Sequence, residues 1–183
     1  MRKRPSTTKK RAYTARERAR LMIPLALGFM VVIPLLISNA YRLDQLLGLP
    51  AIPASLVIKI LAGILGLAGL ALAFWTITLQ WTIGKGTPAP MMPTQKLIVS
   101  GPFKFVRNPM ALGTIIAYLA LAVIAGSISA IILIILVAGM LLAYIRKKEE
   151  AELLLRFGQP YAEYRQRVPF LIPKFSKPSN KMN

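Results

Sequence analysis

The chain of 183 residues contains no cysteine and no histidine. Without cysteine there can be no disulfide framework and no thiolate chemistry. Without histidine the commonest general base and the commonest metal ligand are missing, so we expect no metal site. Acidic residues are also scarce, with six Asp and Glu against 24 Lys and Arg and a formal net charge of +18. Charged residues make up only 16% of the chain and hydrophobic residues 55%, which indicates a membrane protein rather than a soluble domain.

The positive charge is concentrated at the two ends of the chain. Nine of the 24 Lys and Arg lie between Arg2 and Arg20, and nine lie between Arg146 and Lys181. Basic segments that flank apolar spans are typical of the cytoplasmic side of a membrane protein. No basic face interleaved with aromatic residues is present, so we expect no nucleic-acid partner. The expected partner is the lipid bilayer, because basic flanks attract anionic headgroups.

Long apolar segments predict membrane-spanning helices. Leu21–Ala40 is about 20 residues long and matches the hydrocarbon core of a bilayer. A second span lies within 54–81, where Gly63, Gly66 and Gly69 recur every third residue and favour close helix packing. The sequence therefore predicts two N-terminal spans over 21–81, after a basic cytoplasmic segment at 1–20.

A third apolar segment is too long for one span. Met110–Tyr144 has 35 residues without a charge, and a single helix of that length would measure about 52 Å. The "GSIS" stretch at 126–129 is the natural break. It predicts a tight helical hairpin over 110–145, with arms at 110–125 and 129–145.

The polar segment after the hairpin has a helical pattern. A spacing of three or four places one set of residues on a common helix face: Glu150, Leu153, Phe157, Tyr161, Tyr164 and Val168. Gly158 and Pro160 interrupt this pattern, which predicts two short amphipathic helices. The predicted fold is an all-α integral membrane protein with about four transmembrane helices, the last two a tight hairpin, followed by short amphipathic cytoplasmic helices. The positive-inside rule places both termini and the basic loop at 82–109 in the cytoplasm.

The hairpin brings two polar segments together. Residues 101–110 precede it, within the stretch "GPFKFVRNPMALG", and 145–161 follow it. The first segment contributes Arg107, Asn108 and the free backbone N–H groups of a helix start, which can bind a polar or anionic group. The second contributes Glu149, Glu150, Tyr161 and Tyr164. We therefore expect a pocket at the membrane surface, open to a soluble cofactor from the cytoplasm and to a lipid-like substrate from the side.

Each of these residues also has a simpler interpretation. Asn108 and Pro109 fit a helix cap and the first helical position. Arg107 alone fits an interfacial anchor, and the glutamates alone fit a solvated helix face. The order of the segments, rather than any one residue, favours a binding site.

That order resembles the isoprenylcysteine carboxyl methyltransferase family of integral membrane enzymes and the related phospholipid methyltransferases. The resemblance lies in "SGPFKFVRNPMALG" at 100–113 and "EEAELLLRFGQPYAEYRQRVP" at 149–169, and it covers roughly residues 84–173. The "GTPAP" stretch at 86–90 resembles a bacterial-type subgroup, which implies a bacterial cytoplasmic membrane. Residues 82–173 would then form the methyltransferase core and 174–183 a tail.

The resemblance implies methyl transfer from S-adenosylmethionine, with an active site facing the cytoplasm. The residues it assigns to the cofactor are Gln95, Lys96, Leu97, Ile98, Phe103, Asn108, Pro109, Met110, Ala111 and Glu149. Those it assigns to catalysis are Arg107, Arg146 and Glu150. The implied acceptor is lipid-like or a small hydrophobic molecule, and a prenylcysteine-type carboxylate is favoured. Such a carboxylate is ionised at neutral pH and needs no general base, which agrees with a chain without histidine.

The sequence departs from the family at two positions. Asn108 stands where the family usually has His, and an amide can hydrogen-bond but not titrate. Ile145 stands where the family often has Arg, and Arg146 follows one place later, about 100° further around a helix. Two other functions stay open: an NADPH-dependent membrane reductase with a similar C-terminal architecture, and a non-catalytic membrane scaffold. The sequence indicates no oligomeric state.

Overall fold

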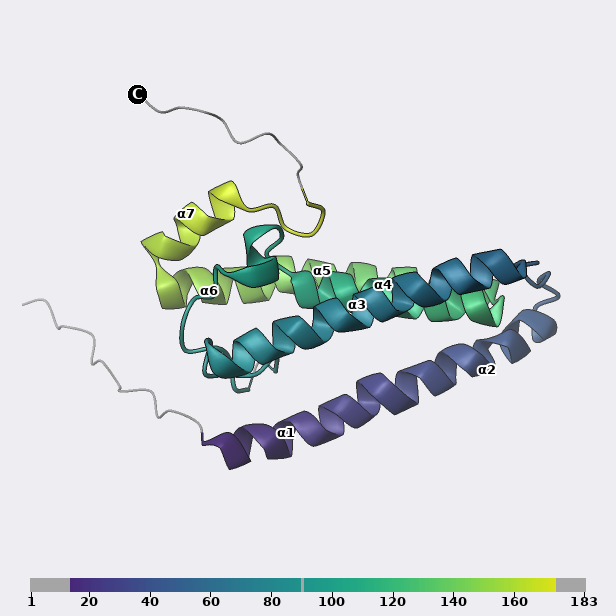
Figure 1. The fold of residues 1–183 in the computed structure, drawn as a ribbon, viewed down its shortest axis with the longest axis horizontal. Helices are drawn as coiled ribbons and strands as arrows, with labels where there is room; N and C mark the ends of the chain where they lie inside the picture. Colours follow the sequence, from purple (N-terminus) through teal and green to yellow (C-terminus); the bar gives the residue numbers. More distant parts are fainter. Residues whose placement is uncertain (1–13, 90, 174–183) are drawn as a thin grey trace, which may run out of the picture.

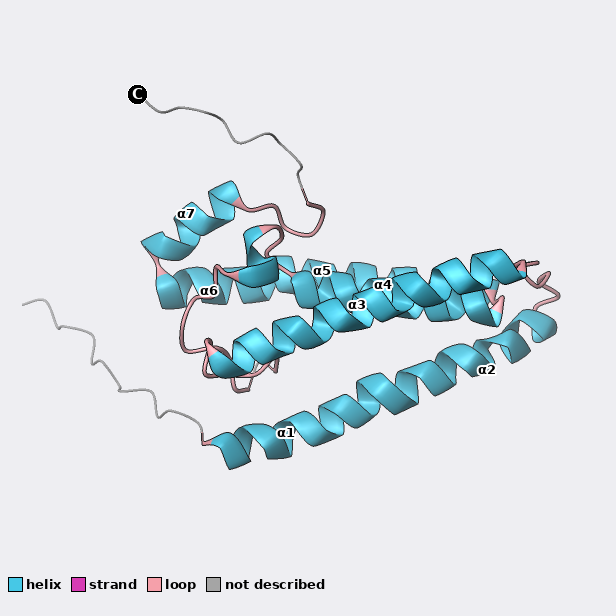
Figure 2. Cartoon of the chain, in the orientation of Figure 1, coloured by secondary structure: helices cyan, strands magenta, loops and turns pink. Residues whose placement is uncertain are grey.

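A computed structural model of the chain describes residues 14–89 and 91–173. The predicted tail at 174–183 and most of the predicted N-terminal segment lie outside the described residues. The helical elements in chain order are α1 (Ala15–Leu27), η1 (Gly28–Val32), α2 (Ile33–Leu46), α3 (Leu56–Thr82), η2 (Gly101–Lys104), α4 (Pro109–Ala125), α5 (Ile128–Tyr144), η3 (Ile145–Glu149), α6 (Glu150–Phe157) and α7 (Gln159–Arg167). No strand occurs among the described residues, so the all-α prediction is confirmed (Figure 2).

Three of the helices in the described part of the chain are long and apolar enough to cross a membrane. They are Ala15–Leu46, Leu56–Thr82 and Ile128–Phe157. The fourth apolar helix, α4, has 17 residues. Its length is therefore about 26 Å, a little less than the roughly 30 Å of bilayer hydrocarbon. The chain is thus an integral membrane protein, and the count of four spanning helices stays a prediction.

The first helix is longer than the predicted span at 21–40. It continues from α1 through the π-helical turn η1 into α2, with Pro34 near the start of α2. Proline has no N–H and clashes with the carbonyl group four residues earlier. The π turn lies immediately before it, and the N–H of Ile33 there donates to the carbonyl of Gly28, five residues back. Such π turns accommodate a local disruption without ending the helix.

Small residues bring α3 and α4 into backbone contact. A Cβ atom built on Gly69 would lie 2.6 Å from the carbonyl oxygen of Gly113, and one built on Gly113 would lie 2.4 Å from that of Gly69. Gly66 likewise faces Ala120 of α4, whereas Gly63 faces open space. The predicted close packing is therefore confirmed for two of the three glycines.

The hairpin turn is where the sequence placed it. Gly126 ends α4 in a left-handed conformation with φ of 68°, which glycine adopts without strain. Ser127 caps α5, because its hydroxyl accepts a hydrogen bond from the N–H of Ala130 at 3.1 Å. The buried carboxylate of Asp44 in α2 accepts a further bond from the N–H of Ser129 at 2.8 Å. The end of α2 and the hairpin turn therefore share one end of the molecule.

The second arm of the hairpin differs from the prediction. It does not end at residue 145 but continues through the π turn η3 into α6, as far as Phe157. The two predicted amphipathic helices are present as α6 and α7, and α6 follows the hairpin arm without a break because no Gly or Pro interrupts the helix before Gly158. The predicted break at Gly158 and Pro160 is confirmed, since Gly158 has φ of 61° and α7 begins directly after it. Figure 1 shows α6, α7 and the loop after α3 at one end, opposite the hairpin turn.

Candidate active site at the polar end of the helices

A pocket lies where α3, the loop after it, the start of α4, the α5–α6 helix and α7 meet, and we call it the main pocket. It is lined by Thr76, Gln80, Thr94, Leu97, Ile98, Phe103, Arg107, Asn108, Pro109, Met110, Ile145, Glu149, Glu150, Leu153, Phe157, Tyr161 and Tyr164. Nine of the thirteen residues that the sequence assigned to a site are in this set. The two polar segments on either side of the hairpin therefore do come together.

A buried ion pair crosses the main pocket. Nη2 of Arg107 lies 2.9 Å from Oε1 of Glu150, and the two side chains are only 11% and 6% exposed. Nη1 of Arg107 donates to the carbonyl of Arg165 at 2.8 Å, and its backbone N–H donates to that of Pro169 at 2.9 Å. Its Nε is buried and has no partner among the described residues. Arg107 thus connects α6 to the C-terminal segment while one donor stays unused.

Asn108 and Pro109 form the start of α4, as the simpler interpretation predicted. Asn108 occupies the N-cap position and Pro109 the first turn, but the Asn108 side chain makes no capping hydrogen bond. Its backbone N–H donates to the carbonyl of Phe170 at 3.2 Å. Within the described part of the chain, the Asn108 amide has no side-chain partner, so it and the free N–H groups of the first helical turn can bind a ligand.

Two tyrosines of α7 close one side of the pocket. The hydroxyl of Tyr164 donates to the carbonyl of Phe103 at 2.8 Å, and its ring centre lies 6.1 Å from that of Tyr161. Both side chains are buried, and burial raises the pKa of each phenol above its ordinary value. Both therefore stay neutral at physiological pH. No described residue hydrogen-bonds the Tyr161 hydroxyl, which can donate to or accept from a ligand.

The structure adds residues that the sequence analysis missed. Thr76 and Gln80 reach the pocket from α3, one helical turn apart, and Ile145 reaches it from η3. Oε1 of Gln80 is buried without a partner among the described residues. The sequence could have indicated Thr76 and Gln80, because two polar side chains four residues apart in an apolar helix share one helix face.

Four predicted site residues lie outside the main pocket. The backbone N–H groups of Gln95 and Lys96 both donate to the carbonyl of Gly84, at 2.6 and 3.3 Å. Ala111 is buried in α4. Arg146 is exposed, with its guanidinium carbon 5.9 Å from the ring centre of Phe170. The roles assigned to these four stay predictions.

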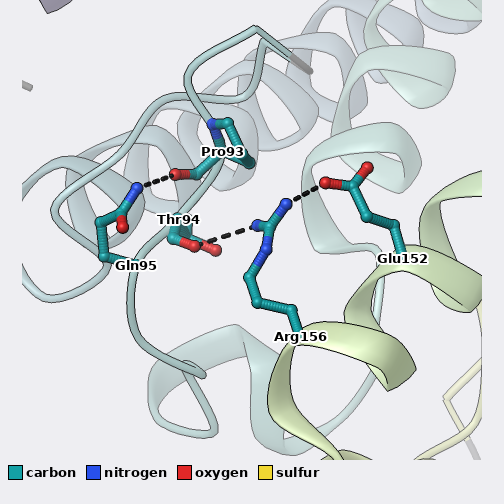
Figure 3. Close-up of polar contacts among 5 residues, drawn as sticks. All are labelled: Pro93, Thr94, Gln95, Glu152 and Arg156. Atoms are coloured by element: carbon teal, nitrogen blue, oxygen red, sulfur yellow. Dashed lines mark hydrogen bonds and ion pairs between the residues drawn. The ribbon is translucent and has the colours of Figure 1, made fainter. Parts of the chain in front are cut away.

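A second, smaller cavity adjoins the main pocket, and we call it the side cavity. It shares Gln80, Thr94, Glu149 and Leu153 with the main pocket and is lined otherwise by Thr87, Pro88, Ala89, Pro93, Tyr144, Glu152 and Arg156. Arg156 bridges its two walls, since Nη1 donates to the carbonyl of Thr94 at 3.1 Å and Nη2 pairs with Glu152 (Figure 3). The sequence analysis did not single out Arg156.

The electrostatics of the main pocket favour a cation. Arg107 is the one cationic side chain in its lining, against the two carboxylates of Glu149 and Glu150. Glu150 is buried beside Arg107, whereas Glu149 is exposed. Aromatic rings from Phe103 and Phe157 complete the wall. The arrangement suits a ligand that combines positive charge, hydrogen-bonding groups and a planar ring. Among the described residues, no group of three or more acidic, His or Cys side chains could hold a metal ion.

Comparison with known proteins points to membrane methyltransferases. A family model described as phospholipid methyltransferase matches residues 57–159, more than half of the chain. Methanethiol S-methyltransferase 1 of Bradyrhizobium diazoefficiens is 37% identical over 94 residues, which are 50% of this chain and 29% of that protein. The chain therefore matches less than a third of the length of this relative. The resemblance seen in the motifs is confirmed, and the chain belongs to the phospholipid methyltransferase family of membrane methyltransferases.

Proposed function

We propose that this protein transfers a methyl group from S-adenosylmethionine to a small or lipid-like hydrophobic acceptor at the membrane surface. The observation that carries the proposal is the main pocket. It unites the segments on both sides of the hairpin and holds buried polar atoms that no described residue satisfies, on Gln80 and Arg107. Unsatisfied buried polar groups cost about 1–3 kcal/mol each, so a ligand that pairs with them gains affinity.

The residues of the pocket fit this cofactor. When bound, it supplies an electrophilic methyl group on a positively charged sulfonium. The excess negative charge of Glu149 and Glu150 over Arg107 stabilises such a cation. The free amide of Asn108 and the N–H groups of the first turn of α4 would bind its carboxylate. Phe103 and Phe157 offer faces for a planar ring.

The chain's own contribution to catalysis is to position the methyl donor and the acceptor and to exclude water from them. Methyl transfer needs the nucleophile in line with the breaking bond, and correct positioning can supply much of the rate enhancement. Arg107 holds α6 and the segment at 165–169 over the site through three separate contacts. Tyr164 holds α7 against Phe103 in the same way. Together these contacts cover the pocket on the side away from the membrane helices.

The acceptor is the open part of the proposal. A prenylcysteine-type carboxylate, favoured by the motifs, needs a free cation, yet Arg107 is paired with Glu150 and Arg146 lies outside the pocket. The position before Arg146 is the buried, apolar Ile145. We therefore favour an acceptor that enters uncharged, such as a thiol, whose S–H proton would pass to a pocket carboxylate such as Glu149 as its sulfur takes the methyl group, and the matched relative is named for methanethiol.

The basic residues of the polar end support a cytoplasmic active site. Lys147 and Lys148 are exposed beside Arg146 at the end of the apolar α5. A cluster of Lys and Arg at one end of a spanning helix is typical of its cytoplasmic side.

Binding of S-adenosylhomocysteine to the detergent-purified chain tests the proposed function. We expect binding in the micromolar range by calorimetry, lost in Glu149→Ala and weakened in Asn108→Ala. Lys148→Ala, which removes a charge from the same helix outside the pocket, is the matched control and should bind normally. A folded, monodisperse wild type that does not bind would reject the proposal. Binding of NADPH instead would favour a reductase, and binding of neither would favour a scaffold.

The acceptor class is tested with a radiolabelled methyl donor. Membranes containing the protein are offered an alkanethiol or N-acetyl-S-farnesylcysteine, which presents a prenylcysteine carboxylate. Transfer to the thiol supports an uncharged acceptor. Transfer to the farnesylated carboxylate contradicts it and restores the acceptor that the motifs favoured.

A further inference from the structure

The loop between α3 and η2 is positioned by individual contacts. Residues 84–100 contain no helix or strand among the described residues, so no regular hydrogen-bond pattern fixes the course of this loop. Its first residues are held at the end of α3, since the N–H groups of Gly84 and Gly86 donate to the carbonyls of Leu79 and Gln80, and its later residues pack against these two glycines. The N–H groups of Gln95 and Lys96 donate to the carbonyl of Gly84, and a Cβ atom on Gly86 would lie 2.5 Å from the backbone of Thr94. The later part of the loop is therefore in direct contact with the backbone of Gly84 and Gly86.

On the other side the loop is held by the Arg156 bridge. The guanidinium of Arg156 donates to the carbonyl of Thr94 at 3.1 Å, across 62 positions of the sequence (Figure 3). Glu152, one helical turn earlier in α6, pairs with the same guanidinium and orients it. The Arg156 side chain is only 14% exposed, so solvent weakens this contact less than it would at the surface.

The contact between Arg156 and Thr94 affects residues that line the main pocket, although Arg156 itself does not line it. Thr94, Leu97 and Ile98 line the main pocket, whereas Arg156 lines only the side cavity. The carbonyl of Thr94 is bonded to α6 only three residues before Leu97 and four before Ile98. A movement of Thr94 away from α6 would therefore displace the wall.

We propose that Arg156 is a positioning residue that fixes the wall Thr94–Ile98 for ligand binding by holding the carbonyl of Thr94. This inference rests on the proposed function of the main pocket. Arg156 touches neither cofactor nor acceptor, and its effect passes through the loop. Removing the Arg156 side chain leaves the contacts between the helices in place. We therefore expect the loop to open locally and the protein to stay folded.

Two measurements test this role together. Hydrogen exchange with mass spectrometry follows the amides of Gln95 and Lys96, whose bonds to Gly84 break when the loop opens. Calorimetry follows S-adenosylhomocysteine. We expect Arg156→Ala to speed exchange in residues 93–98 without ligand and to weaken binding about tenfold, the effect of one charged hydrogen bond. Arg156→Lys keeps a donor and should recover most of both losses. Lys148→Ala, the control for charge, should change neither.

The outcomes separate this inference from the proposed function. Weakened binding with unchanged exchange would mean that Arg156 acts on the pocket through Glu149 or the neighbouring Phe157 ring rather than through the loop, and would overturn the positioning role. Unchanged binding with faster exchange would show that the wall does not matter for the ligand, and would overturn it as well. Faster exchange throughout the helices would mean general destabilisation, again contrary to the inference. A wild type that fails to bind rejects the proposed function itself.

Discussion

The contact between Gly69 and Gly113 predicts a large effect from a single methyl group. In Gly113→Ala, the new Cβ would lie 2.4 Å from the carbonyl oxygen of Gly69 and 2.9 Å from the backbone nitrogen of Ala73. Both neighbours belong to the α3 backbone, so no flexible side chain can move aside. The two helices must separate or shift along each other.

The magnitude follows from two opposing terms. Replacing Gly by Ala inside a helix stabilises it by up to about 1 kcal/mol, because Ala loses less backbone entropy. Overpacking a tight contact costs about 1–3 kcal/mol. Gly139 in α5 provides the matched control, since a Cβ atom there would meet nothing within 4 Å. We therefore expect Gly113→Ala to be less stable than Gly139→Ala by about 1–3 kcal/mol, the overpacking term alone.

Unfolding in mixed micelles with increasing denaturing detergent measures this difference. Because Pro109 and Met110 of α4 line the main pocket one turn before Gly113, a shift of α4 should also weaken binding of S-adenosylhomocysteine in that variant alone. Equal stability of Gly113→Ala and Gly139→Ala would refute the close packing of α3 against α4. Loss of stability with unchanged ligand binding would refute the argument that α4 positions the pocket.

Three further predictions concern buried polar groups. Asp44→Ala should destabilise the chain by about 0.5–2 kcal/mol in thermal unfolding, because the N–H of Ser129 loses its acceptor, and Asp44→Asn should retain most of that stability. Burial raises the pKa of Tyr161 and Tyr164 above the unfolded value of about 10, so the stability that their protonated forms contribute is present below that pH and is lost as the pH rises further. Ultraviolet titration should show both phenols still neutral near pH 10, and replacing both by Phe should reduce the alkaline loss of stability. Arg107→Ala leaves a buried carboxylate unpaired and should cost about 3–5 kcal/mol, a loss that a normal unfolding midpoint would contradict.

Much of the fold could be predicted because its elements depend on local patterns. Uninterrupted apolar runs predicted the helices, and "GSIS" predicted the hairpin turn at Gly126, because glycine and serine there satisfy the ends of two helices. Charge located the end of the apolar arm but not the end of the helix, since residues 146–152 continue the same helix beyond the apolar segment. The motifs around Arg107 and Glu150 could be paired in advance because a hairpin returns the chain to its starting side.

The sequence by itself determined the membrane character, the helical class and the family, since these depend on composition, periodicity and motif order. Only the tertiary structure decided which side chains share the pocket. Gln80 enters it from a helix that is otherwise mostly apolar, and Arg146, exposed in η3, does not line it. The pairing of Arg107 with Glu150 and the Arg156 bridge to a backbone carbonyl are likewise contacts between distant segments. The first leaves no unpaired cation among the described residues that line the main pocket. Such contacts depend on the orientation of helices about their axes, which residue spacing within one helix does not specify.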